Sequence, residues 1–250
     1  MLIHYQTHHP YRSEIYKQEV HFMDKSKNVD AVIKAWSAIT KGVPQEAFDL
    51  EVRLQALTVR LLAQGKPVSA EQLAENWGFP LGEVHRILKQ AEARIEVDKN
   101  GYLIGAGGLS IPPTQHRFRV NSKTLYAWCA LDAIFLPAFL GKTAEIESTD
   151  PVNNETIRLT ITPNGIASMY PDDVVLSIAT PGVSCTYNRV GRDSEVCGQM
   201  HFFSSPASAE VWLKKHPGTL MLTVEEAYQV AHNLWLVRLP EELKYPKGQS

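Results

Sequence analysis

The chain has 250 residues and a formal net charge of −2, with 44% hydrophobic and 21% charged side chains. This length and composition predict a globular protein with one large domain or two small ones around a substantial hydrophobic core. The near-neutral charge excludes a bulk electrostatic attraction to nucleic acid or to an anionic membrane surface.

The first segment, residues 1–45, is expected to be an N-terminal extension that is partly helical. It has neither the apolar core nor the cleavage site of a signal peptide. Its His8-His9 pair is too short a pattern to predict a metal site. Apolar residues recur at helical spacing over residues 29–39, which predicts a helix docked on the rest of the chain.

No membrane span is expected. The longest apolar run, residues 125–140, has 16 residues and contains an acid and a proline, whereas a membrane-spanning helix needs ~20 apolar residues. We therefore expect a cytoplasmic protein.

Residues 46–115 predict a winged helix-turn-helix-like domain. Four leucines share one face of a first helix: Leu50, Leu54, Leu57 and Leu61. Ser69 and Gln72 fit a capping box, and Gly78 closes a short second helix. A third helix follows, and then the Asn-Gly pair at 100–101 predicts a hairpin.

This shape raises the possibility of a DNA-binding regulator, which the charges argue against. Residues 46–120 carry nine basic and nine acidic side chains. The third helix begins PLGEVHR, with Glu83 among its leading residues. A DNA reader usually presents a basic face there. We expect no nucleic acid partner, and keep the regulator as the weaker alternative.

Residues 116–240 predict an α+β domain with a mixed sheet, followed by a C-terminal tail at 241–250. The segment 125–141 is so apolar that it predicts a core helix, capped by Asn121 or Ser122 and ended by Gly141. Further strands are predicted at 116–120, 143–149, 155–162, 165–171 and 174–180, with a central strand at 195–205. Helices are predicted at 206–218 and 223–236, the latter capped by Thr223 and Glu226.

The three cysteines, Cys129, Cys185 and Cys197, are expected to be free thiols, because an odd count without a CxxC pair indicates neither a disulfide framework nor a zinc finger. Cys129 and Asp132 are three residues apart, so both would leave the same face of a helix. Burial would raise the pKa of both groups and leave the carboxyl able to hold and deliver a proton. The plainer interpretation is a buried cysteine with Asp132 turned to solvent.

A second thiol, Cys197, could lie over that helix. Two thiols and one carboxyl suit a soft, thiol-seeking metal better than Zn²⁺ or Mg²⁺. Two motifs carry a resemblance to a known family: LYAWCALD at 125–132, followed by Pro137 and GKTA, and CGQMHFFSSPASAEVWLKKHPG at 197–218. Together with the segment from GKPVSAEQLAENWG to the hairpin, they resemble the organomercurial (alkylmercury) lyases of bacterial mercury resistance, over roughly residues 50–235.

The resemblance implies an enzyme that cleaves the carbon–mercury bond by protonolysis to a hydrocarbon and Hg(II). Cys129 and Cys197 would bind mercury as thiolates, and Asp132 would carry the proton and join the binding of the Hg(II) product. An aromatic surround would suit the organic group: Tyr126, Trp128, Phe135, Phe202 and Phe203.

No organic cofactor is expected, since nothing resembles a GxGxxG or P-loop motif. The implied partners are the organomercurial substrate, free low-molecular-weight cellular thiols required for turnover, and a mercuric reductase that receives Hg(II). Gly198 stands where some family members have another cysteine, and Cys185 has no counterpart and is interpreted as structural or incidental. The principal alternative is a cytoplasmic thiol-based protein that binds or delivers metal without catalysis.

Overall fold

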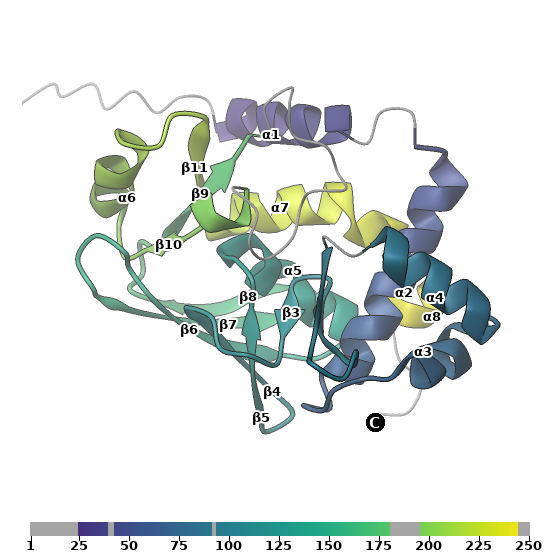
Figure 1. Ribbon diagram of the computed structural model, residues 1–250. Helices are drawn as coiled ribbons and strands as arrows, with labels where there is room; N and C mark the ends of the chain where they lie inside the picture. The colour runs from purple at the N-terminus through teal and green to yellow at the C-terminus, as the bar shows by residue number, and fades with distance from the viewer. Residues whose placement is uncertain (1–24, 40–42, 92–93, 181–195, 245–250) are drawn as a thin grey trace, which may run out of the picture.

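The structure is a computed structural model that describes residues 25–39, 43–91, 94–180 and 196–244. Cys185 and the His8-His9 pair lie outside these ranges. The helix predicted at 29–39 is present as α1 (Lys25–Ile39), and it docks along α7 (Val224–Leu234), as Figure 1 shows. Within the described ranges, no helix combines the length and apolar character that a membrane crossing requires.

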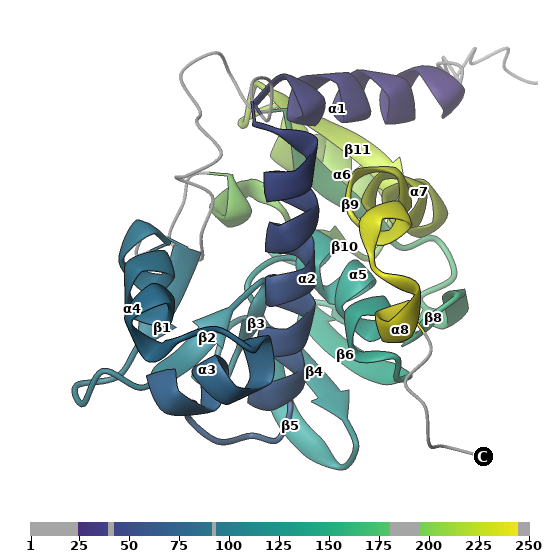
Figure 2. The same cartoon turned by 90° about the vertical axis from the view of Figure 1, so that its right-hand side faces the viewer.

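The predicted winged-helix arrangement is confirmed. Its helices are α2 (Gln45–Leu62), α3 (Ala70–Trp77) and α4 (Leu81–Gln90), and its wing is the antiparallel pair β1 (Ile95–Val97) and β2 (Leu103–Ala106). The reciprocal capping box of Ser69 and Gln72 starts α3, and Gly78 ends it in the left-handed conformation. Figure 2 shows α2 running between the other winged-helix elements and α5.

The wing does not stand apart from the rest of the protein. It continues into one eight-stranded sheet in the order β1-β2-β3-β5-β4-β6-β7-β8. The added strands are β3 (Leu109–Ser110), β4 (His116–Val120), β5 (Lys123–Ala127), β6 (Ala144–Thr149), β7 (Thr156–Thr162) and β8 (Gly165–Tyr170). The short strand β3 therefore joins the helical half to the α+β half.

A second, three-stranded sheet has the order β10-β9-β11, with β9 (Val175–Ala179) central between β10 (Phe202–Phe203) and β11 (Thr219–Thr223). Helix α5 (Ala130–Leu140) is buried between α2, α7 and strands of both sheets. Helix α6 (Pro206–Leu213) covers the small sheet, and η4 (Leu236–Arg238) and α8 (Glu241–Lys244) end the described chain. The predicted α+β class is confirmed. The expectation of a mixed sheet is wrong, because every strand pair among the described residues is antiparallel.

The prediction of one helix over 125–141 is wrong in its first part. Residues 123–127 form β5, and the helix begins only at Ala130, with Cys129 as its N-cap. Asn121 and Ser122 do not cap it. They have positive φ angles of 49° and 60° and make the tight turn between β4 and β5. Gly141 ends the helix in the left-handed conformation, as predicted.

The prediction of a central strand at 195–205 is also wrong. Cys197–Gln199 form a short 3₁₀ turn, η3, and only Phe202–Phe203 pair as a strand, at the edge of the small sheet. The backbone bends here because local hydrogen bonds close the turn. One of them is donated by Met200 N–H to the Cys197 carbonyl at 3.1 Å. The helix predicted from Thr223 and Glu226 is confirmed, including its reciprocal capping box.

Candidate active site

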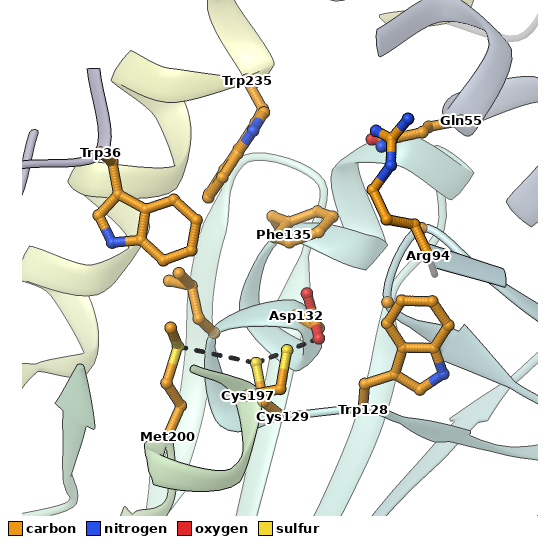
Figure 3. A pocket seen from close by; sticks show the side chains of 13 residues that line it. Trp36, Gln55, Arg94, Trp128, Cys129, Asp132, Phe135, Cys197, Met200 and Trp235 are labelled. Atoms are coloured by element: carbon orange, nitrogen blue, oxygen red, sulfur yellow. Dashed lines mark hydrogen bonds between the residues drawn. The ribbon is translucent and has the colours of Figure 1, made fainter. Parts of the chain in front are cut away.

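A small cavity of about 70 Å³ lies where the two halves of the protein meet. Its walls come from α1, α2, the turn between β2 and β3, the start of α5, η3 and the end of α7. The lining residues are Trp36, Gln55, Arg94, Gly107, Gly108, Trp128, Cys129, Leu131, Asp132, Phe135, Cys197, Met200 and Trp235 (Figure 3). All three predicted site residues are among them.

Cys129 and Asp132 are brought together by the start of α5. Cys129 is the N-cap, with extended backbone angles of φ −146° and ψ 175°, and Asp132 lies in the first turn. The Cys129 thiol donates a hydrogen bond to Oδ2 of Asp132 at 3.1 Å. The predicted proximity is therefore present, but it arises from a strand-to-helix junction and not from two positions within a helix.

Cys197 completes the group from a distant part of the chain. Its Sγ, the Cys129 Sγ and a carboxylate oxygen of Asp132 all lie within 4.8 Å of one another. Both thiols are buried, at 2% and 5% exposure, while Asp132 is half-buried at the cavity wall. The three groups can thus contact one small ligand.

Burial sets the protonation of this group. It raises the pKa of Asp132 to about 6, although hydrogen bonds from the thiol and backbone of Cys129 oppose the shift. Burial also raises the pKa of the Cys129 thiol well above its usual value, and the neighbouring Cys197 and Asp132 add to this. A helix N-terminus favours a thiolate, but here the loss of solvation outweighs it. The site therefore holds protons that an arriving cation can displace.

The remaining lining residues form two contrasting walls. Trp36, Phe135 and Trp235 pack edge to face or tilted, with ring centroids 5.3 to 5.8 Å apart. Gln55 and Arg94 lie on the other side (Figure 3), and Arg94 forms an ion pair with Glu51. The cavity is thus aromatic on one side, while the other side combines these two polar side chains with the Trp128 ring (Figure 3).

Of the five aromatic residues expected around the organic group, two line the cavity, Trp128 and Phe135. Phe202 and Phe203 are fully buried in the small sheet and Tyr126 is on β5, and none of the three is a lining residue. Trp36 and Trp235 take their place. These two come from segments that no local sequence pattern connects to the thiols.

Gly108 is a lining residue that sequence reasoning missed. It has a φ of +87°, and a Cβ added to it would lie 2.6 Å from the Asp132 carboxyl carbon. Only glycine allows the backbone to approach the carboxyl so closely in this conformation. The GAGG run at 105–108 was the available signal, since consecutive glycines mark turns and close backbone approaches.

A larger cavity of about 350 Å³ adjoins the first, inside the winged-helix half. The two share Gln55, Arg94 and Gly107 as lining residues. Apolar side chains such as Leu54, Phe79 and Ile87 line much of the larger cavity. The small cavity therefore has a mainly apolar space next to it.

Fold and site together define a two-part α+β protein with a buried dithiol–carboxyl centre that suits a soft, thiol-seeking metal. Comparison with known families agrees with this class. Residues 109–235 match the family model of alkylmercury lyase, and residues 46–107 match that of the helix-turn-helix domain of alkylmercury lyase. The chain belongs to the alkylmercury lyase family, a family of enzymes, and the resemblance found in the sequence is confirmed.

Individual relatives support the same assignment. An alkylmercury lyase of Staphylococcus epidermidis is 39% identical over 76% of this chain and 84% of its own length. One of Bacillus cereus is 40% identical over 69% of this chain and 76% of its own length. One of Pseudomonas putida is 35% identical over 76% of this chain and 84% of its own length.

A solved structure shares the fold. It is the crystal structure of the mercury-bound form of MerB2, which superposes with a TM-score of 0.65 at 24% sequence identity. The match covers 84% of this chain and 99% of that one. The order of a helical half followed by an α+β half is therefore shared with that protein.

Proposed function

We propose that this protein cleaves the carbon–mercury bond of organomercurials by protonolysis, releasing a hydrocarbon and Hg(II). Cys129 and Cys197 bind mercury as thiolates, and Asp132 carries the proton to the leaving carbon. The observation that supports this most directly is the meeting of two thiol sulfurs and one carboxylate oxygen within 4.8 Å in a buried cavity.

The two thiols supply both protons that the proposed reaction needs, one for the leaving carbon and one for the leaving thiolate. The Cys129 thiol gives its proton to the Asp132 carboxylate, to which it is already hydrogen-bonded, and the sulfur binds mercury. The organomercurial arrives with its mercury bound to one low-molecular-weight thiolate, the carrier. Cys197 loses its proton to this carrier thiolate as the carrier leaves mercury, and the Cys197 sulfur binds mercury in its place. Two sulfur donors push electron density toward carbon, and the electron pair of the carbon–mercury bond takes the Asp132 proton. The products are the hydrocarbon, a carrier thiol and Hg(II) on two thiolates, with Asp132 ionised again and available to ligate the metal.

The burial of the site supports this chemistry. A carboxylate with a pKa raised to about 6 accepts the thiol proton more readily than an ordinary aspartate and can pass it on, and general acids work best when their pKa lies near the working pH. The apolar wall of Trp36, Phe135 and Trp235 excludes water and accommodates an alkyl or aryl group. The Hg(II) product then leaves to free low-molecular-weight thiols, which a cytoplasmic protein would find in excess, and onward to a mercuric reductase. No organic cofactor enters any step.

The direct test is to incubate the purified protein with phenylmercury and excess thiol and to measure benzene. We expect benzene from the parent and none from Cys129→Ala or Cys197→Ala. Cys185→Ala is the matched thiol control, and it should retain the parent rate. Stoichiometric mercury binding without benzene would instead indicate the binding and delivery protein, and salt-sensitive binding to duplex DNA would favour the regulator.

A further inference from the structure

We infer that Met200 is a third sulfur ligand of mercury in this site. This inference rests on the proposed binding of mercury by Cys129 and Cys197. Met200 lies within the family motif at 197–218, but sequence reasoning gave it no role. Its side chain lines the same cavity as the two thiols.

The backbone of Met200 connects the two thiol-bearing segments. Its carbonyl accepts a hydrogen bond from Ala130 N–H at 3.1 Å, directly after Cys129, and its own N–H donates to the Cys197 carbonyl at 3.1 Å. These two bonds place Met200 between the start of α5 and the η3 turn. Any movement of one thiol segment relative to the other must also move this residue.

The side chain of Met200 returns toward the thiols. Its Sδ lies 3.8 Å from the Cys129 Sγ, and the residue is only 1% exposed. Figure 3 shows the thioether on one side of the two thiols and the Asp132 carboxyl on the other. A metal held between the thiols would therefore have a third sulfur within reach, on the side away from the proton carrier.

The chemistry of a thioether fits this position. It is a soft donor without charge, and Hg(II) on two thiolates is already electrically neutral. A third donor of this kind adds electron density to mercury without adding charge to a buried site. The unbranched methionine side chain can also rotate to follow the metal as the organic group leaves.

Selenomethionine substitution makes the inference testable by spectroscopy. The full-length protein is produced with selenomethionine, loaded with one equivalent of Hg(II), and measured by X-ray absorption at the selenium and mercury edges. We expect a mercury neighbour in the selenium spectrum of the parent. It should be lost in Met200→Leu, which keeps a similar volume, and retained in the control Met221→Leu, because Met221 packs in the small cluster around Val175 and Phe203.

The two spectra separate this inference from the proposed function. The mercury spectrum reports the thiolate pair independently of methionine. Two thiolates on mercury with no mercury neighbour at selenium in the parent would overturn the role of Met200 and leave the proposed function standing. Absence of the thiolate pair would overturn both. The decisive measurement is the selenium spectrum of the mercury-loaded parent protein. A folding defect in Met200→Leu would therefore not obscure the result.

Discussion

The Cys129 thiol donates a hydrogen bond of 3.1 Å to Asp132 because the two residues are the N-cap and a first-turn residue of α5. A capping position points its side chain back toward the first turn of the helix. The thiol and the carboxyl thus face each other before any ligand arrives. The same helix start that orders the backbone also places the two groups between which we propose that the proton moves.

Asp132→Asn should separate binding from turnover. Asparagine keeps the size and polarity of the side chain but cannot carry the proton, so mercury should still bind through the thiols. General acid–base catalysis typically contributes ~10²–10⁴-fold, and we expect benzene release from phenylmercury to fall within that range. The exposed Asp172→Asn is the matched control. Benzene release by Asp132→Asn at the parent rate would show that Asp132 is not the proton carrier.

The same substitution should stabilise the protein at neutral and alkaline pH. The pKa of Asp132 is about 6 in the folded state against a reference of 3.8. Ionisation of Asp132 is therefore less favourable in the folded protein than in the unfolded chain. The free energy of unfolding falls as the pH rises above about 4, and the full loss is reached above about pH 6. At ~1.4 kcal/mol per pKa unit, this loss of stability is at most about 3 kcal/mol. The loss should be smaller than this limit because the Asp132 side chain is only half-buried. Urea unfolding should show Asp132→Asn more stable than the parent at pH 8 and similar at pH 3.5; equal stability at both would contradict the raised pKa.

Gly108→Ala should damage turnover through the position of Asp132. The added Cβ would lie 2.6 Å from the carboxyl carbon, so the carboxyl must move. Gly101→Ala is a close control, because Gly101 has a similar φ of +82° but no atom within 4 Å of its added Cβ. Both variants should lose about 1–2 kcal/mol of stability from the left-handed conformation. Only Gly108→Ala should lose benzene release, and equal activity of the two variants would rule out this effect.

His116 should make the protein sensitive to acid. Its Nδ1 lies 2.8 Å from the Ser148 hydroxyl, and burial, with a smaller effect of His201, lowers its pKa to about 3. The unfolded chain takes up a proton near pH 6.5, whereas the folded protein resists it. Stability from this group is therefore lost as the pH falls from about 6.5 toward 3, by up to ~1.4 kcal/mol per pH unit. In a plot of the free energy of unfolding against pH, His116→Gln should flatten the acid side. His232→Gln, at an exposed position, should leave it unchanged. The same slope in both variants would show that His116 does not cause the acid sensitivity.

The larger cavity should determine which organic groups are accepted. It shares Gln55, Arg94 and Gly107 with the small cavity that holds the thiols. Ala91→Phe, at a half-buried lining position, should fill part of it. We expect kcat/KM to fall for bulky aryl mercurials and to stay near the parent value for methylmercury. Equal losses for both substrates would show that the cavity does not receive the organic group.

The fold could be predicted wherever the sequence carries a local signal. The capping boxes at Ser69 and Thr223 and the left-handed Gly141 each require particular side chains at fixed spacing, and the corresponding helix ends are present. The apolar run from 125 lacks such a signal, since buried strands and buried helices are equally apolar. Its division at Trp128 and Cys129 depends on the pairing of residues 123–127 with β3 and, through the Asn121–Ser122 turn, with β4. The same two turn residues are also acceptable helix caps, so the sequence alone did not identify the hairpin.

The site could be predicted in part. Cys129 and Asp132 are close in sequence, and Cys197 was paired with them through a family motif. Gln55, Arg94, Trp36 and Trp235 reach the cavity only through packing of distant helices, and their residue types are ordinary in those positions. The position of the Met200 sulfur depends on a turn that was predicted as a strand.

The glycine turn between β2 and β3 limits which segments can be exchanged between members of this family. The helix-turn-helix match ends at residue 107 and the lyase match begins at residue 109, so the boundary between the two matched segments falls on Gly108. Gly108 lies directly against the carboxyl of Asp132, which is the proposed proton carrier. Replacing either segment alone with that of a relative would change one side of this contact and leave the other unchanged. A hybrid of two family members should therefore keep the position of Asp132 only where its two segments are compatible at Gly108.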